Sequence, residues 1–184
     1  MDSLYNIFVR SYCLREVSDE EFHALIEDIY FTEEVQSLVR FPQHSTVNRL
    51  NHITAVAYMT YQLAKRFNCD CEAAARGAVL HDLFYYDWHD KSWDHRPSGY
   101  RHPGFAVINA RILCGGTPGK KEENMILRHM WPLTPIPPKY KEGWLLTFAD
   151  KYCANCEMLL AKEGKFYRRF RADVHLCKKK ANKK

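Results

Sequence analysis

The sequence predicts an all-α fold built as a single domain. Apolar residues recur at helical spacing along nearly all of the 184 residues, and no stretch alternates apolar and polar residues for long, as a half-buried strand would. Hydrophobic residues make up 46% of the chain and charged residues 27%, which is the balance of a folded globular protein with one core. We therefore expect a helical bundle of about six to eight helices.

Six segments carry this helical pattern. The first begins with Ser18 and Glu21, whose spacing is that of a capping box. The second is expected to begin at Ser45 or Thr46 and to end near Asn68. The six expected helices cover residues 17–41, 45–67, 70–86, 103–114, 119–131 and 141–163.

Short polar residues, proline and glycine mark the breaks between the later helices. Asp70 is expected to cap the third helix, which we expect to contain His81 and Asp82. The stretch 87–102 is rich in Asp, Ser, Pro and Gly, as irregular loops are. Pro103 suits the first turn of a helix, so the fourth helix is expected to start there.

Several histidines and aspartates lie on the apolar faces of these helices. Burying them separately would be costly, because an unpaired buried charge must be neutralised or compensated, whereas convergence on a cation removes that cost. Imidazole and carboxylate ligands without a thiolate favour iron, manganese or zinc. The candidate ligands, all expected on helices or next to them, are His52, His81, Asp82, His102, His129 and Asp150.

The order of these residues resembles a known family. His52, then the His81-Asp82 pair, then Asp150 is similar to the pattern of the HD-domain superfamily of metal-dependent phosphohydrolases, and the likeness spans roughly residues 44–160. The segments HDLFYYDW and HMWPLT are also similar to those of bacterial HD proteins. The resemblance implies a helical HD domain over residues 44–162 that binds divalent transition metal ions.

In the binuclear branch of that family, two further histidines lie between the HD pair and the last aspartate. His102 in YRHPGFA and His129 in ILRHMWP fall in that interval and resemble those two. The resemblance implies two ions of Fe, Mn, Zn or Co, with Asp82 bridging them. The first ion would take His52, His81 and Asp150, and the second would take His102 and His129.

The activity that the resemblance implies is hydrolysis of a phosphate ester, of a nucleotide or a similar small molecule. Two cations would lower the pKa of a shared water, which would attack phosphorus as hydroxide. Asp82 and Lys151 are the catalytic candidates. The candidates for binding the substrate phosphate are Arg76, Arg101 and Lys151, and those for protonating the leaving group are Asp87, His89, Asp94 and His95.

Two other functions share these features. HD-type di-iron oxygenases, which cleave a C–H or C–P bond, use the same ligand set. A non-catalytic module that senses nucleotides or associates with RNA would use the fold without chemistry. A structural zinc site built on Cys153 and Cys156, with Cys69 and Cys71, is disfavoured because the first pair lies in a helical pattern, and the odd number of seven cysteines predicts free thiols.

The ends of the chain differ from its centre. Residues 1–43 are expected to form a helical segment that packs on the core. Residues 162–184 hold ten of the 27 lysines and arginines, against two acidic residues, so 163–184 is expected to be a basic, solvated tail in weak contact with nucleic acid at most. No apolar run is long enough to cross a membrane and no secretory leader is evident, which favours a cytoplasmic protein without membrane contact.

Overall fold

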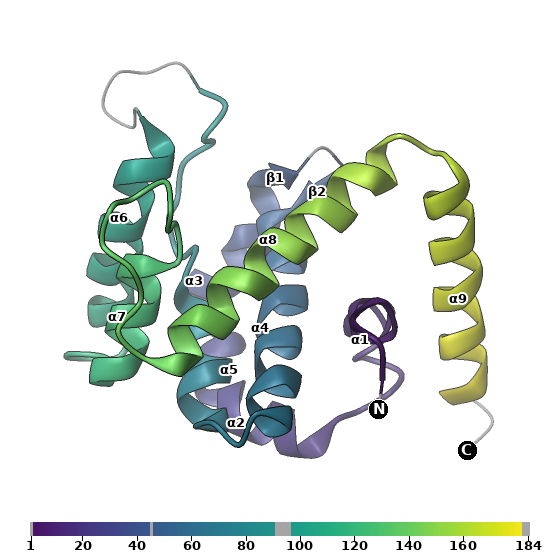
Figure 1. The fold of residues 1–184 in the computed structure, drawn as a ribbon, viewed down its shortest axis with the longest axis horizontal. Coiled ribbons are helices and arrows are strands. Elements are labelled where there is room, and N and C mark those ends of the chain that lie inside the picture. Colours follow the sequence, from purple (N-terminus) through teal and green to yellow (C-terminus); the bar gives the residue numbers. More distant parts are fainter. Residues whose placement is uncertain (1, 45, 91–96, 182–184) are drawn as a thin grey trace.

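Helices make up most of the computed structural model, which describes residues 2–44, 46–90 and 97–181. The all-α fold class is therefore confirmed (Figure 1). A small antiparallel hairpin of β1 (Pro42–His44) and β2 (Val47–Asn48) was not predicted. The helices are α1 (Leu4–Ser11), α2 (Glu20–Tyr30), α3 (Glu33–Gln36), the 3-10 helix η1 (Ser37–Arg40), α4 (Arg49–Arg66), α5 (Cys71–Leu80), α6 (Ser98–Leu113), α7 (Lys120–Arg128), α8 (Lys141–Ala161) and α9 (Lys165–Ala181).

The long helix α4 lies at the centre of the fold and packs against α1, α5 and α8. Residues on most of its sides are buried, including Ile53, Ala57 and Tyr61, as expected of a helix that is apolar on nearly all faces. The pair α6 and α7 lies at one end of the molecule, where α7 packs against both α5 and α8 (Figure 1). The helices α4, α5, α6, α7 and α8 therefore meet around one region.

The helix starts differ in part from the predictions. Asp70 caps α5 as predicted, because its side chain accepts a hydrogen bond from the Ala73 backbone N–H. Asp19, not Ser18, caps α2. The central helix α4 begins after Asn48, which is later than predicted because the β1–β2 hairpin takes up the preceding residues. Of its two predicted starts, Thr46 lies in the hairpin turn and Ser45 lies outside the described residues.

Two further helix boundaries correct the sequence analysis. The helix α5 ends at Leu80, so His81 and Asp82 follow its end and do not lie within it. The helix α6 begins at Ser98, and Pro103 lies inside it, where its missing N–H removes one intrahelical hydrogen bond. Both corrections matter for function, because His81 and Asp82 then come from the turn after α5 and His102 comes from within α6.

The predicted solvated tail is wrong for the residues of α9. This helix packs against α1 and α8, and the ring of Phe170 is buried against Phe8 and Tyr12. The Tyr5 hydroxyl donates to Asp173 at 2.7 Å, so polar contacts hold the helix as well. Residues 182–184 lie outside the described part of the chain. Within that part, no helix combines the length and apolar character required to cross a bilayer.

Candidate metal centre

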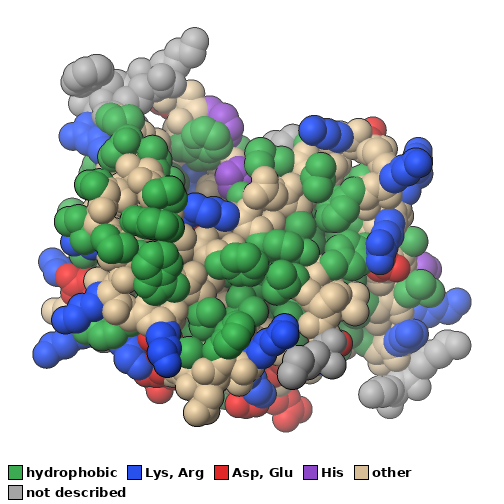
Figure 2. All heavy atoms as spheres, in the orientation of Figure 1, with side chains coloured by type: hydrophobic (Ala, Val, Ile, Leu, Met, Phe, Trp, Pro, Cys, Tyr) green, Lys and Arg blue, Asp and Glu red, His purple; other side chains and the backbone are tan. Residues whose placement is uncertain are grey.

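All six predicted ligands converge where α4, α5, α6, α7 and α8 meet. His52 comes from α4, His102 from the second turn of α6 and Asp150 from the middle of α8. His81 and Asp82 follow α5, and His129 is the residue that ends α7. All except Asp150, which is partly buried, are buried. In Figure 2, histidine side chains and a basic side chain are visible in the hollow between the α6–α7 part and α8.

The first group of ligands joins α4, α5 and α8. The Nε2 atom of His52 lies 3.2 Å from Asp150 Oδ1, and the Nε2 atom of His81 lies 3.9 Å from the same oxygen. One donor atom from each of the three residues lies within 4.8 Å of the other two. This group could hold a metal ion, and it is the set that the resemblance assigns to the first ion.

The second group surrounds the Asp82 carboxylate. Its Oδ1 atom lies 3.3 Å from His102 Nε2 and 3.7 Å from His129 Nε2, and its Oδ2 atom lies 3.7 Å from His81 Nε2. His81, Asp82 and His129 form a second set whose donor atoms all lie within 4.8 Å. Asp82 therefore lies between the two groups, as a bridging ligand would.

Backbone hydrogen bonds set the tautomer of three of these histidines. The Nδ1 atoms of His81, His102 and His129 bind the carbonyls of Ala78, Ser98 and Ile126 at 2.7, 2.8 and 2.8 Å. A carbonyl oxygen only accepts, so Nδ1 carries the hydrogen in each ring. In the neutral ring, Nε2 is then a bare lone pair directed into the site.

Whether a cation fits the site depends on how these lone pairs are arranged. Burial, followed by the charges of His81 and His102, lowers the pKa of His129 to about 3, so its ring is neutral at pH 7. Its Nε2 atom nevertheless lies 2.9 Å from that of His102. The Nε2 atom of His81 and the Oδ1 atom of Asp82 are buried without a hydrogen-bond partner. Clustered lone pairs of nitrogen and oxygen suit a divalent cation.

Two residues that the sequence analysis missed hold the Asp82 carboxylate. The Gln43 amide donates to Asp82 Oδ2 at 2.6 Å, and the buried Arg49 donates through Nε to the Gln43 oxygen at 2.8 Å. Arg49 also donates to the Phe84 carbonyl at 2.6 Å, and burial lowers its pKa to about 10. Arg49 is one turn before His52 on α4, and this spacing is the only sequence signal that could have suggested a role.

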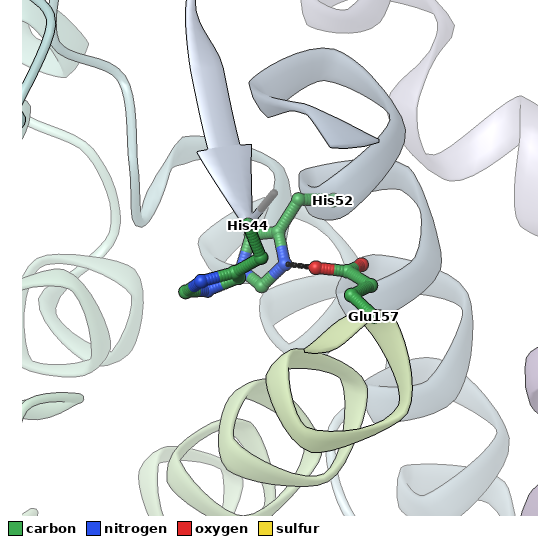
Figure 3. Close-up of side chains that lie close together, drawn as sticks. All are labelled: His44, His52 and Glu157. Carbon is green, nitrogen blue, oxygen red and sulfur yellow. Dashed lines mark hydrogen bonds and ion pairs between the residues drawn. The ribbon is translucent and has the colours of Figure 1, made fainter. Parts of the chain in front are cut away.

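A third missed residue, Glu157, supports His52. The Nδ1 atom of His52 donates to Glu157 Oε2 at 2.8 Å, and Figure 3 shows the carboxylate reaching from α8 to the His52 ring. Burial acts to lower the pKa of His52, but Glu157 and Asp150 together raise it well above its ordinary value. Glu157 follows Asp150 by seven residues, which places both on one face of α8, and this spacing was the available signal.

Four of the candidate ligands, Asp82, His102, His129 and Asp150, line a cavity of about 300 Å³. Lys151 lies on its wall and donates from Nζ to the His129 carbonyl at 3.2 Å, and burial lowers the pKa of this lysine despite the attraction of Asp150. The other described residues that line the cavity include Gln43, His44, Phe84, Trp88, Ser98, Met130 and Ala154.

The structure does not bring the other predicted phosphate-binding residues to the cavity. Arg76 binds both carboxylate oxygens of Asp28 on α2, at 2.6 and 2.9 Å, and lies 3.4 Å from Glu122 on α7. This role is structural, so its prediction as a substrate residue is corrected. Arg101 is exposed on α6 and does not line the cavity.

Of the four predicted proton donors, the two that the structure describes do not line the cavity either. Asp87 Oδ1 and His89 Nδ1 lie 2.8 Å apart. Both side chains are about half exposed, so this pair lies on the surface. Asp94 and His95 lie outside the described residues. All seven cysteines are free, and no cysteine belongs to a possible metal cluster in the described part of the chain.

Comparison with known proteins yields no match: no family model, no curated protein and no solved structure matches this chain. The fold and the site alone therefore define the class. This is an all-α protein with buried clusters of histidine and carboxylate side chains that could hold a metal ion.

Proposed function

We propose that the protein is an HD-type, metal-dependent phosphohydrolase that hydrolyses a phosphate ester of a nucleotide or a similar small molecule. The observation that carries the proposal is the convergence of six histidine and aspartate side chains, from three helices and the C-terminal ends of two others, on one site, with three histidines held so that Nε2 faces inward. The order of these residues along the chain resembles that of the HD superfamily.

The ligands divide into two ion positions that share one carboxylate. His52, His81 and Asp150 would hold the first ion, His102 and His129 the second, and Asp82 would contact both. Divalent ions of Fe, Mn, Zn or Co supply Lewis acidity at a phosphoryl oxygen and lower the pKa of water. The chain keeps the Asp82 carboxylate ionised for this role: burial alone would raise its pKa, but the neighbouring His81 and His102 lower it well below the ordinary value.

Lys151 supplies a positive charge on the wall of the same cavity. Its ammonium group is held by the His129 carbonyl and lies on the lining of the cavity that Asp82, His102 and Asp150 also line, where it can bind a phosphoryl oxygen. The rings of Phe84 and Trp88 on the cavity wall provide an apolar surface for the organic part of a substrate. Of the predicted phosphate-binding residues, Lys151 alone lines the cavity.

The test is turnover of a panel of phosphate esters by protein reconstituted separately with manganese, iron, zinc and cobalt. Assays without oxygen distinguish hydrolysis from oxygenase chemistry. We expect phosphate release under anaerobic conditions, and its loss in Asp82→Asn. Activity that strictly requires O₂ and ferrous iron would establish the oxygenase alternative instead. Absence of bound metal and of turnover under all conditions would support the non-catalytic alternative.

A further inference from the structure

The four histidines of the site are not supported equally. His81, His102 and His129 each donate from Nδ1 to a neutral backbone carbonyl. His52 alone donates from Nδ1 to a carboxylate, that of Glu157 (Figure 3). The side chain of Glu157 is fully buried, its Oε2 atom binds His52, and its Oε1 atom has no hydrogen-bond partner.

The buried carboxylate makes the first ion position more negative than the second. At the first position, the Asp150 carboxylate is one of the ligands, and the Glu157 carboxylate lies directly behind His52. At the second position, the shared Asp82 is the carboxylate ligand. The Nδ1 atoms of His102 and His129 donate to neutral backbone carbonyls and not to a carboxylate. Attraction between a cation and a carboxylate is strong where water is excluded, so this difference favours an ion at the first position.

Glu157 also affects how His52 binds a metal ion, through the hydrogen bond to its imidazole ring. An imidazole that donates its Nδ1–H to a carboxylate has a more basic Nε2, and the bond keeps the ring in one orientation. His52 comes from α4 and Glu157 from α8, so the pair also holds these two helices in register at the site. These effects act on one ion position only, because no other histidine of the six ligands has a carboxylate on Nδ1.

We infer that Glu157 is a positioning residue that makes the His52–His81–Asp150 position the tighter of two, so that the ions bind in a fixed order with this position filled first. The inference rests on the proposed binuclear site. It adds an order of binding and a residue outside the ligand set that determines this order.

The experiment is a titration of metal-free protein with Co²⁺, followed by visible absorption and by competition with a chromophoric chelator. Two resolved binding steps are expected for the unaltered chain. Asp150→Asn should remove the tighter step, and His129→Ala should remove the weaker one. The reverse assignment, with the tighter step lost in His129→Ala, would overturn the inference.

Glu157→Gln tests the role of the charge. Glutamine retains an oxygen that accepts from His52 Nδ1 but has no negative charge. We expect the affinity of the first step to fall by about 10- to 100-fold, with the second step unchanged, so that the two steps merge. Two steps that remain resolved with their original affinities in folded Glu157→Gln protein would also overturn the inference. Should this variant not fold, the Asp150→Asn and His129→Ala titrations still test the order of binding, and the reverse order would still overturn the inference.

Glu142→Gln is the matched control. Glu142 is a buried glutamate on the same helix, but it binds the Asp70 N–H and Lys121 and none of the six ligands. This variant should keep both metal affinities even if its stability falls. Failure of the unaltered chain to bind any of Co²⁺, Mn²⁺, Fe²⁺ and Zn²⁺ would overturn the proposed function itself, which is a different outcome from unchanged binding by Glu157→Gln.

Discussion

The Nε2 atoms of His102 and His129 lie 2.9 Å apart, although the Nδ1 atom of each ring is already committed to a backbone carbonyl. Two lone pairs at this distance repel each other unless a proton or a metal ion lies between the rings. The nearest carboxylate is Asp82, whose Oδ1 atom faces both rings and has no hydrogen-bond partner.

Substitution of the ligands should remove metal ions selectively. Purified protein should carry close to two transition metal ions, and His102→Ala or His129→Ala should lose one of them. Asp82→Ala should lose both, together with all activity, because its carboxylate lies between the two groups. Elemental analysis of the dialysed proteins measures this directly. Retention of full metal content and activity by Asp82→Ala would show that the proposed mechanism is wrong.

Chelation of the metal should lower the thermal stability of the protein. An ion that binds only the folded state stabilises it by about 2.7 kcal/mol when its free concentration is 100 times the dissociation constant. Differential scanning fluorimetry with and without a chelator should therefore show a fall in Tm for the unaltered chain. The same chelator should leave the Tm of Asp82→Ala unchanged, and an equal fall in both proteins would show that the effect does not come from this site.

Removal of Gln43 should disturb both stability and metal binding. Gln43→Leu leaves the Arg49 Nε and the Asp82 Oδ2 without their partner, and each buried polar group left unpaired costs about 1 to 3 kcal/mol. We expect a lower free energy of unfolding in urea and weaker Co²⁺ binding. Gln36→Leu is the control, because Gln36 donates to the Tyr30 carbonyl outside the site. It should affect stability alone, and equal weakening of Co²⁺ binding in both variants would contradict a specific role for Gln43.

Lys151 and Arg76 should behave differently in catalysis. Lys151→Met removes a positive charge from the cavity wall and should lower kcat/KM for a phosphate ester by about 100-fold. Arg76→Met removes the bond to Asp28 between α5 and α2, so it should lower stability by up to about 1 kcal/mol and leave kcat/KM unchanged. Steady-state kinetics and urea unfolding of the two variants separate these outcomes, and equal loss of activity would contradict the assignment of Arg76.

Acid should destabilise the start of α5. The Asp70 N–H donates to Glu142 at 3.0 Å, and Lys121 donates to both carboxylates. The hydrogen bond from the Ala73 N–H lowers the pKa of Asp70. Burial acts to raise it, and Lys121 lowers it further. The pKa of Glu142 is lowered because the Asp70 N–H and Lys121 together outweigh burial. Since both pKa values are lower in the folded state, the stabilisation is complete above the unfolded values and is lost as the pH falls through the folded ones.

Thermal unfolding between about pH 6 and pH 3 measures this loss. The Tm of the unaltered chain should fall below about pH 4.5, and Glu142→Gln should show a smaller fall because one of the two groups no longer titrates. The variant should also be less stable than the unaltered chain at pH 6. Parallel Tm curves for the two proteins would show that this carboxylate does not contribute to the acid response.

Local pattern was sufficient to predict the all-α class, the central parts of α4, α5, α7 and α8, and the inward direction of His52 and Asp150. Helical spacing places His52 on the apolar side of its helix whatever that side packs against, because 3.6 residues per turn determines which side chains share a face. The same rule placed Asp150 inward on α8. The cap of α5 by Asp70 was equally predictable, because it depends on a hydrogen bond to a residue three positions away.

The tertiary structure decided everything that depends on which faces meet. Glu157 and Arg49 look like ordinary surface charges in the sequence, and only the packing of α8 and of the β1–β2 hairpin against α4 places them behind the ligands. The same holds for α9, whose basic sequence suggests a solvated tail until Phe170 meets α1. The physical reason is that helical spacing sets a side chain's direction on its own helix, whereas its partner belongs to another segment. For His52 that partner is Glu157, 105 residues further along the chain.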